Sequence, residues 1–120
     1  MSRSAVEKLA LTILLSAIKQ RASEGRLWRD GSGSPRVDFV IEGVSREELR
    51  PPPELYQPLL EQFARMADLA VPPPDQVTRG TIELLLGADR SHSFELEIRA
   101  VGTMRSLRFR ASTAMRSGAP

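Results

Sequence analysis

Residues 93–111 read SFELEIRAVGTMRSLRFRA, and this stretch decides the class of fold. Apolar and polar residues alternate on both sides of Gly102-Thr103, which is the pattern of two half-buried strands. A two-residue turn with glycine first joins such strands into an antiparallel hairpin. The hairpin register predicts four cross-strand pairs: Leu96 with Phe109, Ile98 with Leu107, Glu97 with Arg108, and Glu95 with Arg110. One face of the hairpin is therefore predicted to be apolar and the other to be complementary in charge.

The chain before this hairpin carries signals for two helices and further strands. Ser4 and Glu7 form a capping-box pattern at the start of a helix over residues 4–22. A second helix is predicted over residues 54–69, between the proline triplets 51–53 and 72–74. Strand patterns lie at 26–29, 36–42 and 81–86, with turns at 30–35 and 87–91.

These elements predict one α+β domain over residues 1–112, followed by a flexible tail at 113–120. We expect an antiparallel-rich sheet of about five strands with two main helices packed on it.

The composition excludes several kinds of site. The 120 residues contain no cysteine and one histidine, so a disulfide scaffold, a thiolate metal site and paired imidazole chemistry are all excluded. The 17 basic and 15 acidic residues leave a net charge of only +2, although every basic residue except Lys8 and Lys19 is arginine. This balance does not by itself indicate a nucleic-acid partner.

The sequence also lacks the motifs of common enzymes. It contains no Walker-type P-loop, no GxSxG elbow, no HExxH and no calcium loop. His92 is predicted to lie at the edge of the turn that follows Gly87, at the surface and without an orienting partner. We therefore expect a protein that is not an enzyme and that holds neither cofactor nor metal.

The apolar run over residues 9–18 is too short to span a membrane, which needs roughly 20 residues. Lys19-Gln20-Arg21 follows it in place of a small-residue cleavage site, so a secretory leader is not expected. The expected compartment is the cytoplasm.

The first helix is apolar on more than one side. Val6, Leu9, Ile13 and Ala17 form one row, whereas Leu11, Leu15 and Ile18 form another nearly opposite. One sheet does not cover both rows. Either the proline-rich loops cover the second row, or it binds a partner protein or a second copy of this chain. Leu11, Leu15 and Ile18 are thus the candidate partner-binding residues.

A competing interpretation is binding of nucleic acid through arginines. Its candidate phosphate contacts are Arg79, Arg105, Arg108 and Arg110. Against it, Arg108 and Arg110 face glutamates in the hairpin register, and an aromatic content of 5% provides few stacking platforms. Nucleic acid is therefore the less favoured partner.

Five segments of the sequence form an ordered set: 14–24 (LLSAIKQRASE), 37–44 (VDFVIEGV), 52–53 with 64–70 (PP and ARMADLA), 74–82 (PDQVTRGTI) and 94–103 (FELEIRAVGT). Together they resemble the N-terminal, PAS-like domain that precedes the motor in type II secretion and type IV pilus assembly ATPases. In order, they resemble the family's "LL..A....ASDIH" helix, its "VR.R.DG.L" strand, its proline pair with "R.K.MA.LDIAE", and its "PQDGRI" and "VDLRVSTLPT" regions.

The departures from the family pattern bear on function. Arg79 matches the arginine of "QDGR", but Glu97 stands where the family has an arginine implicated in nucleotide contacts. The motor domain with its P-loop is not in this sequence. The resemblance thus implies a stand-alone, non-catalytic adaptor or regulatory module that binds a protein such as a secretion or pilus motor, or itself. Because the resembled domain is PAS-like, a third interpretation is a small-molecule sensor.

Overall fold

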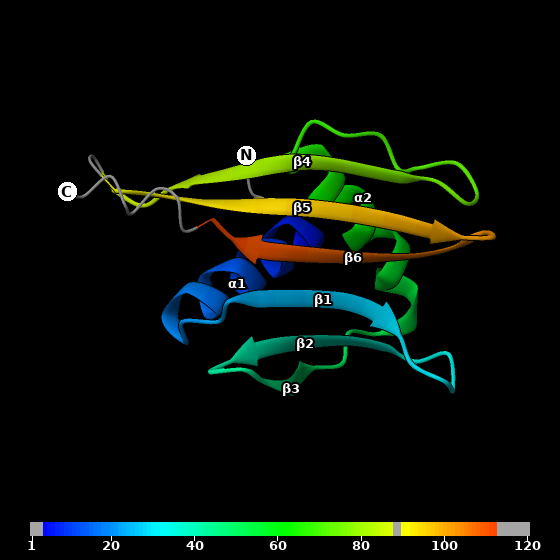
Figure 1. Ribbon diagram of the computed structural model, residues 1–120, viewed down its shortest axis with the longest axis horizontal. Helices are drawn as coiled ribbons and strands as arrows, with labels where there is room; N and C mark the ends of the chain where they lie inside the picture. The colour runs from blue at the N-terminus through cyan, green and yellow to red at the C-terminus, as the bar shows by residue number, and fades with distance from the viewer. Residues whose placement is uncertain (1–3, 88–89, 113–120) are drawn as a thin grey trace.

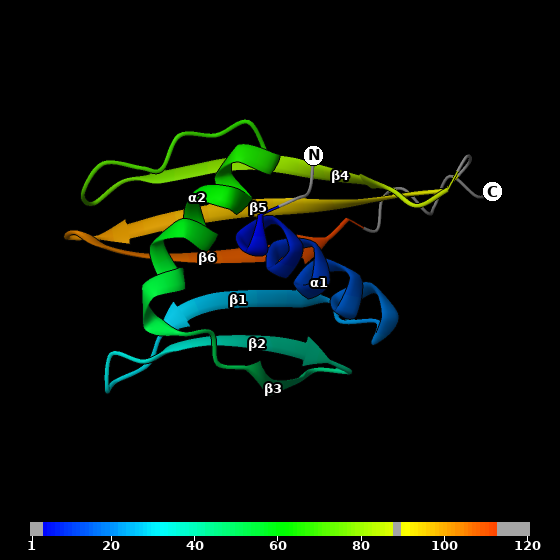
Figure 2. The ribbon, with the colours of Figure 1, turned by 180° about the vertical axis from the view of Figure 1, so that it is seen from behind.

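The computed structural model describes residues 4–87 and 90–112. Its elements, in chain order, are α1 (Ala5–Lys19), β1 (Glu24–Arg29), β2 (Pro35–Ile41), β3 (Val44–Leu49), a 3-10 turn (Pro53–Leu55), α2 (Tyr56–Met66), β4 (Val77–Leu85), β5 (Ser91–Val101) and β6 (Met104–Ala111). The strands form one antiparallel sheet in the order β3-β2-β1-β6-β5-β4. Figures 1 and 2 show both helices on the same face of this sheet. The α+β class is confirmed, and the described sheet has six strands where about five were expected.

The additional strand is β3, in a segment for which the sequence predicts no strand. Four of its six residues are exposed and its sequence, VSREEL, has no apolar alternation, so the pattern of a half-buried strand is missing. Glu42 and Gly43 both have positive φ (53° and 79°), which is the backbone of a primed hairpin turn. That turn folds β3 back along β2, where it forms an edge of the sheet.

The terminal hairpin has the predicted register in full. All four expected pairs are present, and Gly102 has φ +60° at the first position of the two-residue turn. The prediction that His92 lies at the edge of a turn is wrong. His92 lies within β5, opposite Leu84, because β5 begins at Ser91. The tail predicted at 113–120 lies outside the described residues.

The first helix begins as predicted, the second begins at Tyr56 after the 3-10 turn instead of at residue 54, and both end earlier than predicted. Ser4 and Glu7 form a capping box, in which the Ser4 hydroxyl accepts from Glu7 N–H at 3.1 Å and the Glu7 carboxylate accepts from Ser4 N–H at 2.9 Å. α1 ends at Lys19 because Arg21 takes a left-handed conformation (φ 58°), and Asp68 does the same beyond α2. In the described ranges, neither helix has the length and apolar character that crossing a membrane requires.

Aromatic rings fill the space between the sheet and the helices. Phe109 of β6 contacts three other phenylalanine rings at centroid distances of 5.4–6.3 Å: Phe39 of β2, Phe63 of α2 and Phe94 of β5. Its ring lies directly over Gly25 of β1, where a Cβ atom would be 2.1 Å from the ring. The core is therefore built on the sheet face that the helices cover.

Candidate functional site

The opposite face of the sheet, here called the open face, is covered by neither described helix (Figure 1). The alternate residues of each strand that point away from the core lie on it. Its basic residues are Arg26, Arg36, Arg79, Arg99, Arg108 and Arg110. Its acidic residues are Glu24, Asp38, Glu47, Glu83, Glu95 and Glu97. The open face thus carries many charges of both signs in equal number.

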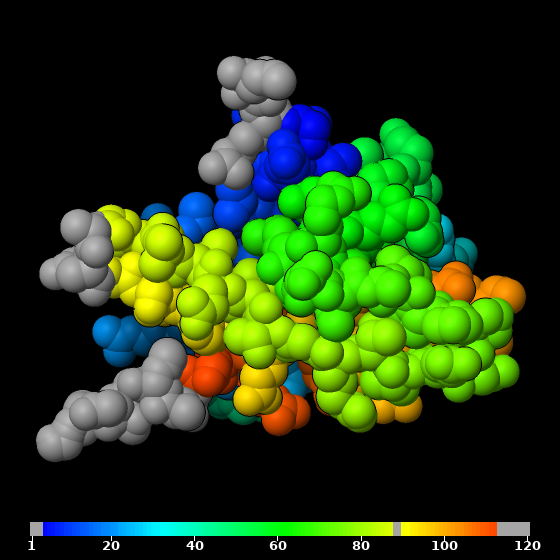
Figure 3. Space-filling model, turned by 90° about the horizontal axis from the view of Figure 1, so that it is seen from above, coloured from blue at the N-terminus to red at the C-terminus, as the bar shows by residue number. Residues whose placement is uncertain are grey.

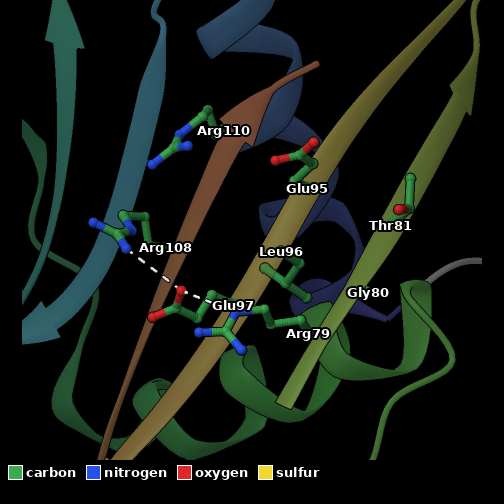
Figure 4. A pocket seen from close by; sticks show the side chains of 8 residues that line it. All are labelled: Arg79, Gly80, Thr81, Glu95, Leu96, Glu97, Arg108 and Arg110. Carbon is green, nitrogen blue, oxygen red and sulfur yellow. Dashed lines mark hydrogen bonds and ion pairs between the residues drawn. The ribbon is translucent and has the colours of Figure 1, made fainter. Parts of the chain in front are cut away.

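Glu97 of β5 is the centre of the largest charge cluster on this face. Its carboxylate lies 3.0 Å from the Arg99 guanidinium, 3.4 Å from that of Arg108 on β6 and 3.5 Å from that of Arg79 on β4. Figure 4 shows Arg79 and Arg108 reaching Glu97 from the two neighbouring strands.

The side chain of Glu97 is only 17% exposed, and this burial by itself would raise the pKa of its carboxyl. The hydrogen bond from Arg99 and the charges of Arg108, Arg99 and Arg79 outweigh burial, so the pKa of Glu97 is lowered. The carboxylate is held ionised in a fixed place.

Beside this cluster is a depression of about 400 Å³ on the surface of the sheet. Arg108 and Arg110 line one side of it, and Arg79, Gly80 and Thr81 of β4 line the other (Figure 4). Both β6 arginines are also within ion-pair distance of Glu24 on β1, at 4.0 and 3.9 Å. Glu95, Leu96 and Glu97 of β5 line the depression between its two sides, so charges of both signs surround it.

A second cluster surrounds Trp28 on β1. The indole N–H donates to the buried Asp38 carboxylate at 2.9 Å, and Arg36 donates to the same carboxylate at 3.0 Å. The guanidinium of Arg26 stacks on the indole ring, 4.1 Å from its centroid. This cluster was not predicted from the sequence, since it depends on the register that places Trp28 opposite Arg36 and Arg26 opposite Asp38. The signal for it in the sequence is the matching alternation of residues 26–28 (RLW) and 36–38 (RVD), which pair with each other across the turn at 30–35.

The candidate residues on α1 do not form one exposed row. Leu15 is 43% exposed, whereas Leu11 and Ile18 are half-buried and pack against the core. Nearby, Glu48 of β3 accepts hydrogen bonds from Ser16 and Gln20, so the end of the helix is bound to the edge of the sheet. Of the three predicted partner-binding residues, Leu15 alone offers substantial free surface.

The four arginines proposed as phosphate contacts divide between the two faces. Arg79, Arg108 and Arg110 gather on the open face, as described above. Arg105 points the other way: its guanidinium donates to the carbonyls of Pro72 (2.8 Å) and Thr103 (3.3 Å). Its own carbonyl accepts from the Tyr56 hydroxyl. Arg105 therefore joins β6 to the first residue of α2 and to the segment that follows that helix, and it does not belong to the open-face cluster.

No family model matches this sequence, and no curated protein matches it. Within the described ranges, acidic and histidine side chains form no group of three or more that would hold a metal ion. The chemistry that the open face offers is paired, immobilised charge.

Proposed function

We propose that this protein is a non-catalytic protein-interaction module, an adaptor or regulator, which binds another protein through the open face. The observation that carries the proposal is the equal number of arginines and carboxylates on that face, most of which form ion pairs within or between strands. Such a pattern suits a protein surface with the complementary arrangement of charges, because matched charges give specificity and orient the encounter.

The same pairing makes nucleic acid the weaker candidate. Arg79, Arg99 and Arg108 each form an ion pair with the Glu97 carboxylate, and Arg110 lies beside Glu24. Phosphate binding draws its free energy from unneutralised cations that displace counterions. Here a phosphate would have to compete with carboxylates that are part of the sheet.

We further propose that the domain is PAS-like and related to the N-terminal domain of type II secretion and type IV pilus ATPases. The order of one helix, three strands, a second helix and three strands is compatible with this relation, because the five resembling segments fall on α1, β2, α2, β4 and β5 in the order that the family has. A motor ATPase of this kind, in the cytoplasm, is the partner that the relation favours. A small-molecule sensor is less favoured, since Phe39, Phe63 and Phe109 occupy the space between sheet and helices.

The test is titration calorimetry with a purified secretion or pilus motor ATPase from the same genome. Reversing two open-face charges, with Arg108→Glu and Arg110→Glu together, should weaken binding by on the order of tenfold or more. Arg46→Glu, an exposed change on β3 whose side chain lies on the opposite side of the strand, is the matched control. Equal losses in both variants would contradict the assignment of the surface.

Two further measurements address the alternatives. Retention on DNA that falls steeply with salt would favour the nucleic-acid interpretation. Micromolar binding of ATP by calorimetry, or hydrolysis of ATP, would contradict a non-catalytic module.

A further inference from the structure

The two edges of the sheet are unequally protected against pairing with another strand. β3 is six residues long, and its pairing with β2 contains a register shift near Val37 and Asp38. β4 is nine residues long, pairs with β5 without a shift, and contains neither proline nor lysine. Short length, irregularity, lysine and proline are the usual devices that keep edge strands from associating. Figure 3 shows β4, in yellow-green, at the molecular surface.

The hydrogen bonds at the two ends of β4 show which of its backbone groups face outward. Ala100 N–H donates to the Gln76 carbonyl, and Leu86 N–H donates to the Arg90 carbonyl, both at 2.8 Å. Because bonded and non-bonded pairs alternate in an antiparallel ladder, the even-numbered residues of β4 bond to β5. The N–H and C=O groups of the odd-numbered residues 77–85 therefore point away from the sheet, and none of them joins a turn or loop hydrogen bond within the described residues.

The segment before β4 packs against the even-numbered residues. Leu69 lies against Gly80, and the Ala70 carbonyl accepts from the Thr78 hydroxyl at 3.2 Å. Thr78 and Gly80 belong to the helix-covered face of β4, as do the buried Ile82 and Leu84. The contacts thus engage the residues that bond inward and leave the outward backbone groups of the odd-numbered residues unused.

We propose that a second copy of this chain pairs with this edge, β4 against β4, antiparallel about a two-fold axis at Thr81. In this register Arg79 of each copy lies opposite Glu83 of the other, and Thr81 lies opposite Thr81. Opposite charges and threonine pairs are favourable cross-strand neighbours. Centring the axis on residue 79 or 83 would instead place like charges opposite each other.

The apolar residues fit the same register. Leu85 is 79% exposed, more than any other large hydrophobic side chain in the described ranges, and it would lie opposite Val77 of the second copy. On the helix-covered face, Gly80 would lie opposite Ile82, a small residue against a large one. Arg79 is 68% exposed, so its present ion pair with Glu97 costs little to rearrange. The pairing of β4 with β4 would join the two sheets into one continuous sheet, with the open faces of the two copies side by side.

The first test is the mass of the purified protein by light scattering over a range of concentrations. The chain of 13.3 kDa should show a concentration-dependent approach to twice that mass. Thr81→Pro removes an outward N–H that β5 does not use, so it should abolish the dimer while the fold is retained. Thr81→Val keeps that N–H and should still dimerise. Circular dichroism and thermal melting of each variant verify folding.

A charge swap tests the register independently of proline. Arg79→Glu places two glutamates opposite each other at both ends of the pairing and should weaken the dimer on the order of tenfold. The double variant Arg79→Glu with Glu83→Arg restores opposite charges and should recover the dimer. A wild type that stays monomeric at its highest soluble concentration would overturn the proposal. A dimer that neither Thr81→Pro nor the single charge reversal weakens would overturn it as well, because another surface would then hold it.

Self-association is measured on this protein alone, whereas the proposed function is measured by binding to a motor through Arg108 and Arg110. Each can fail without the other.

Discussion

The two faces of the sheet are made by the same strands but are held together by different forces. In β6, Phe109 is buried among aromatic rings, while the adjacent Arg110 is more than half exposed beside Glu24. Deleting a buried phenylalanine costs about 3–5 kcal/mol, whereas an exposed ion pair contributes about 0–1 kcal/mol. The fold therefore depends on the helix-covered face, and the residues of the open face are free to serve binding.

The sharpest test of this division compares the two neighbouring residues of β6. Phe109→Ala should lower the free energy of unfolding by about 3–5 kcal/mol, because it removes the ring that contacts three others and leaves a cavity. Arg110→Ala should lower it by less than about 1 kcal/mol. Urea denaturation measures both. Equal losses would show that the open face stabilises the fold as much as the core does.

A second test adds one methyl group to the core. Gly25→Ala would place a Cβ atom 2.1 Å from the Phe109 ring, so the ring must move, at a cost of about 1–3 kcal/mol or more. The control is Gly31→Ala, where nothing lies within 4 Å of the added atom. If the overlap is the cause, Phe109→Leu in the same chain should make Gly25→Ala less costly. A double-mutant cycle with no coupling would contradict this explanation.

A third test concerns the turn that fixes the register of β5 against β6. A one-residue slip between β5 and β6 would exchange their apolar and charged faces. Gly102 has φ +60°, so Gly102→Val should destabilise the protein by about 1 kcal/mol or more, and Gly31→Val should do so less. The measurement is again chemical denaturation. An unaffected Gly102→Val variant would show that the alternating faces alone fix the register.

The smallest expected effect is the response of the open face to pH. The pKa of Glu97 is lowered in the folded protein below its ordinary value of 4.5. The stabilisation linked to this carboxylate is therefore fully present above about pH 4.5 and is lost as the pH falls through the folded pKa. Thermal melting of wild type and Glu97→Gln should converge as the medium becomes more acidic. A constant difference across the acidic range would assign the stabilisation to other groups.

The ease of predicting each element from sequence follows the same division between faces. The terminal hairpin was predictable to the residue, because one of its faces is buried and Gly102-Thr103 fixes the turn. β3 was not, because an exposed edge strand needs no apolar alternation. The pair between Glu97 and Arg108 followed from the hairpin register, but Arg79 could not be added to it, since the apolar pattern of β4 begins only near Ile82. Arg105 could have been separated from Arg108 and Arg110, because it shares its side of the strand with the buried Leu107.

The pairing of β1 with β6 brings together strands from opposite ends of the described chain. The hairpin of β1 and β2 and the meander of β4, β5 and β6 each consist of neighbours in sequence and can form early. Their union closes a long loop, so it is the entropically expensive and slow step of folding. During synthesis β1 keeps an unpaired edge until residues 104–111 have left the ribosome. A chain that stops before Met104 leaves both β1 and β5 with a free edge, and such a product is expected to aggregate.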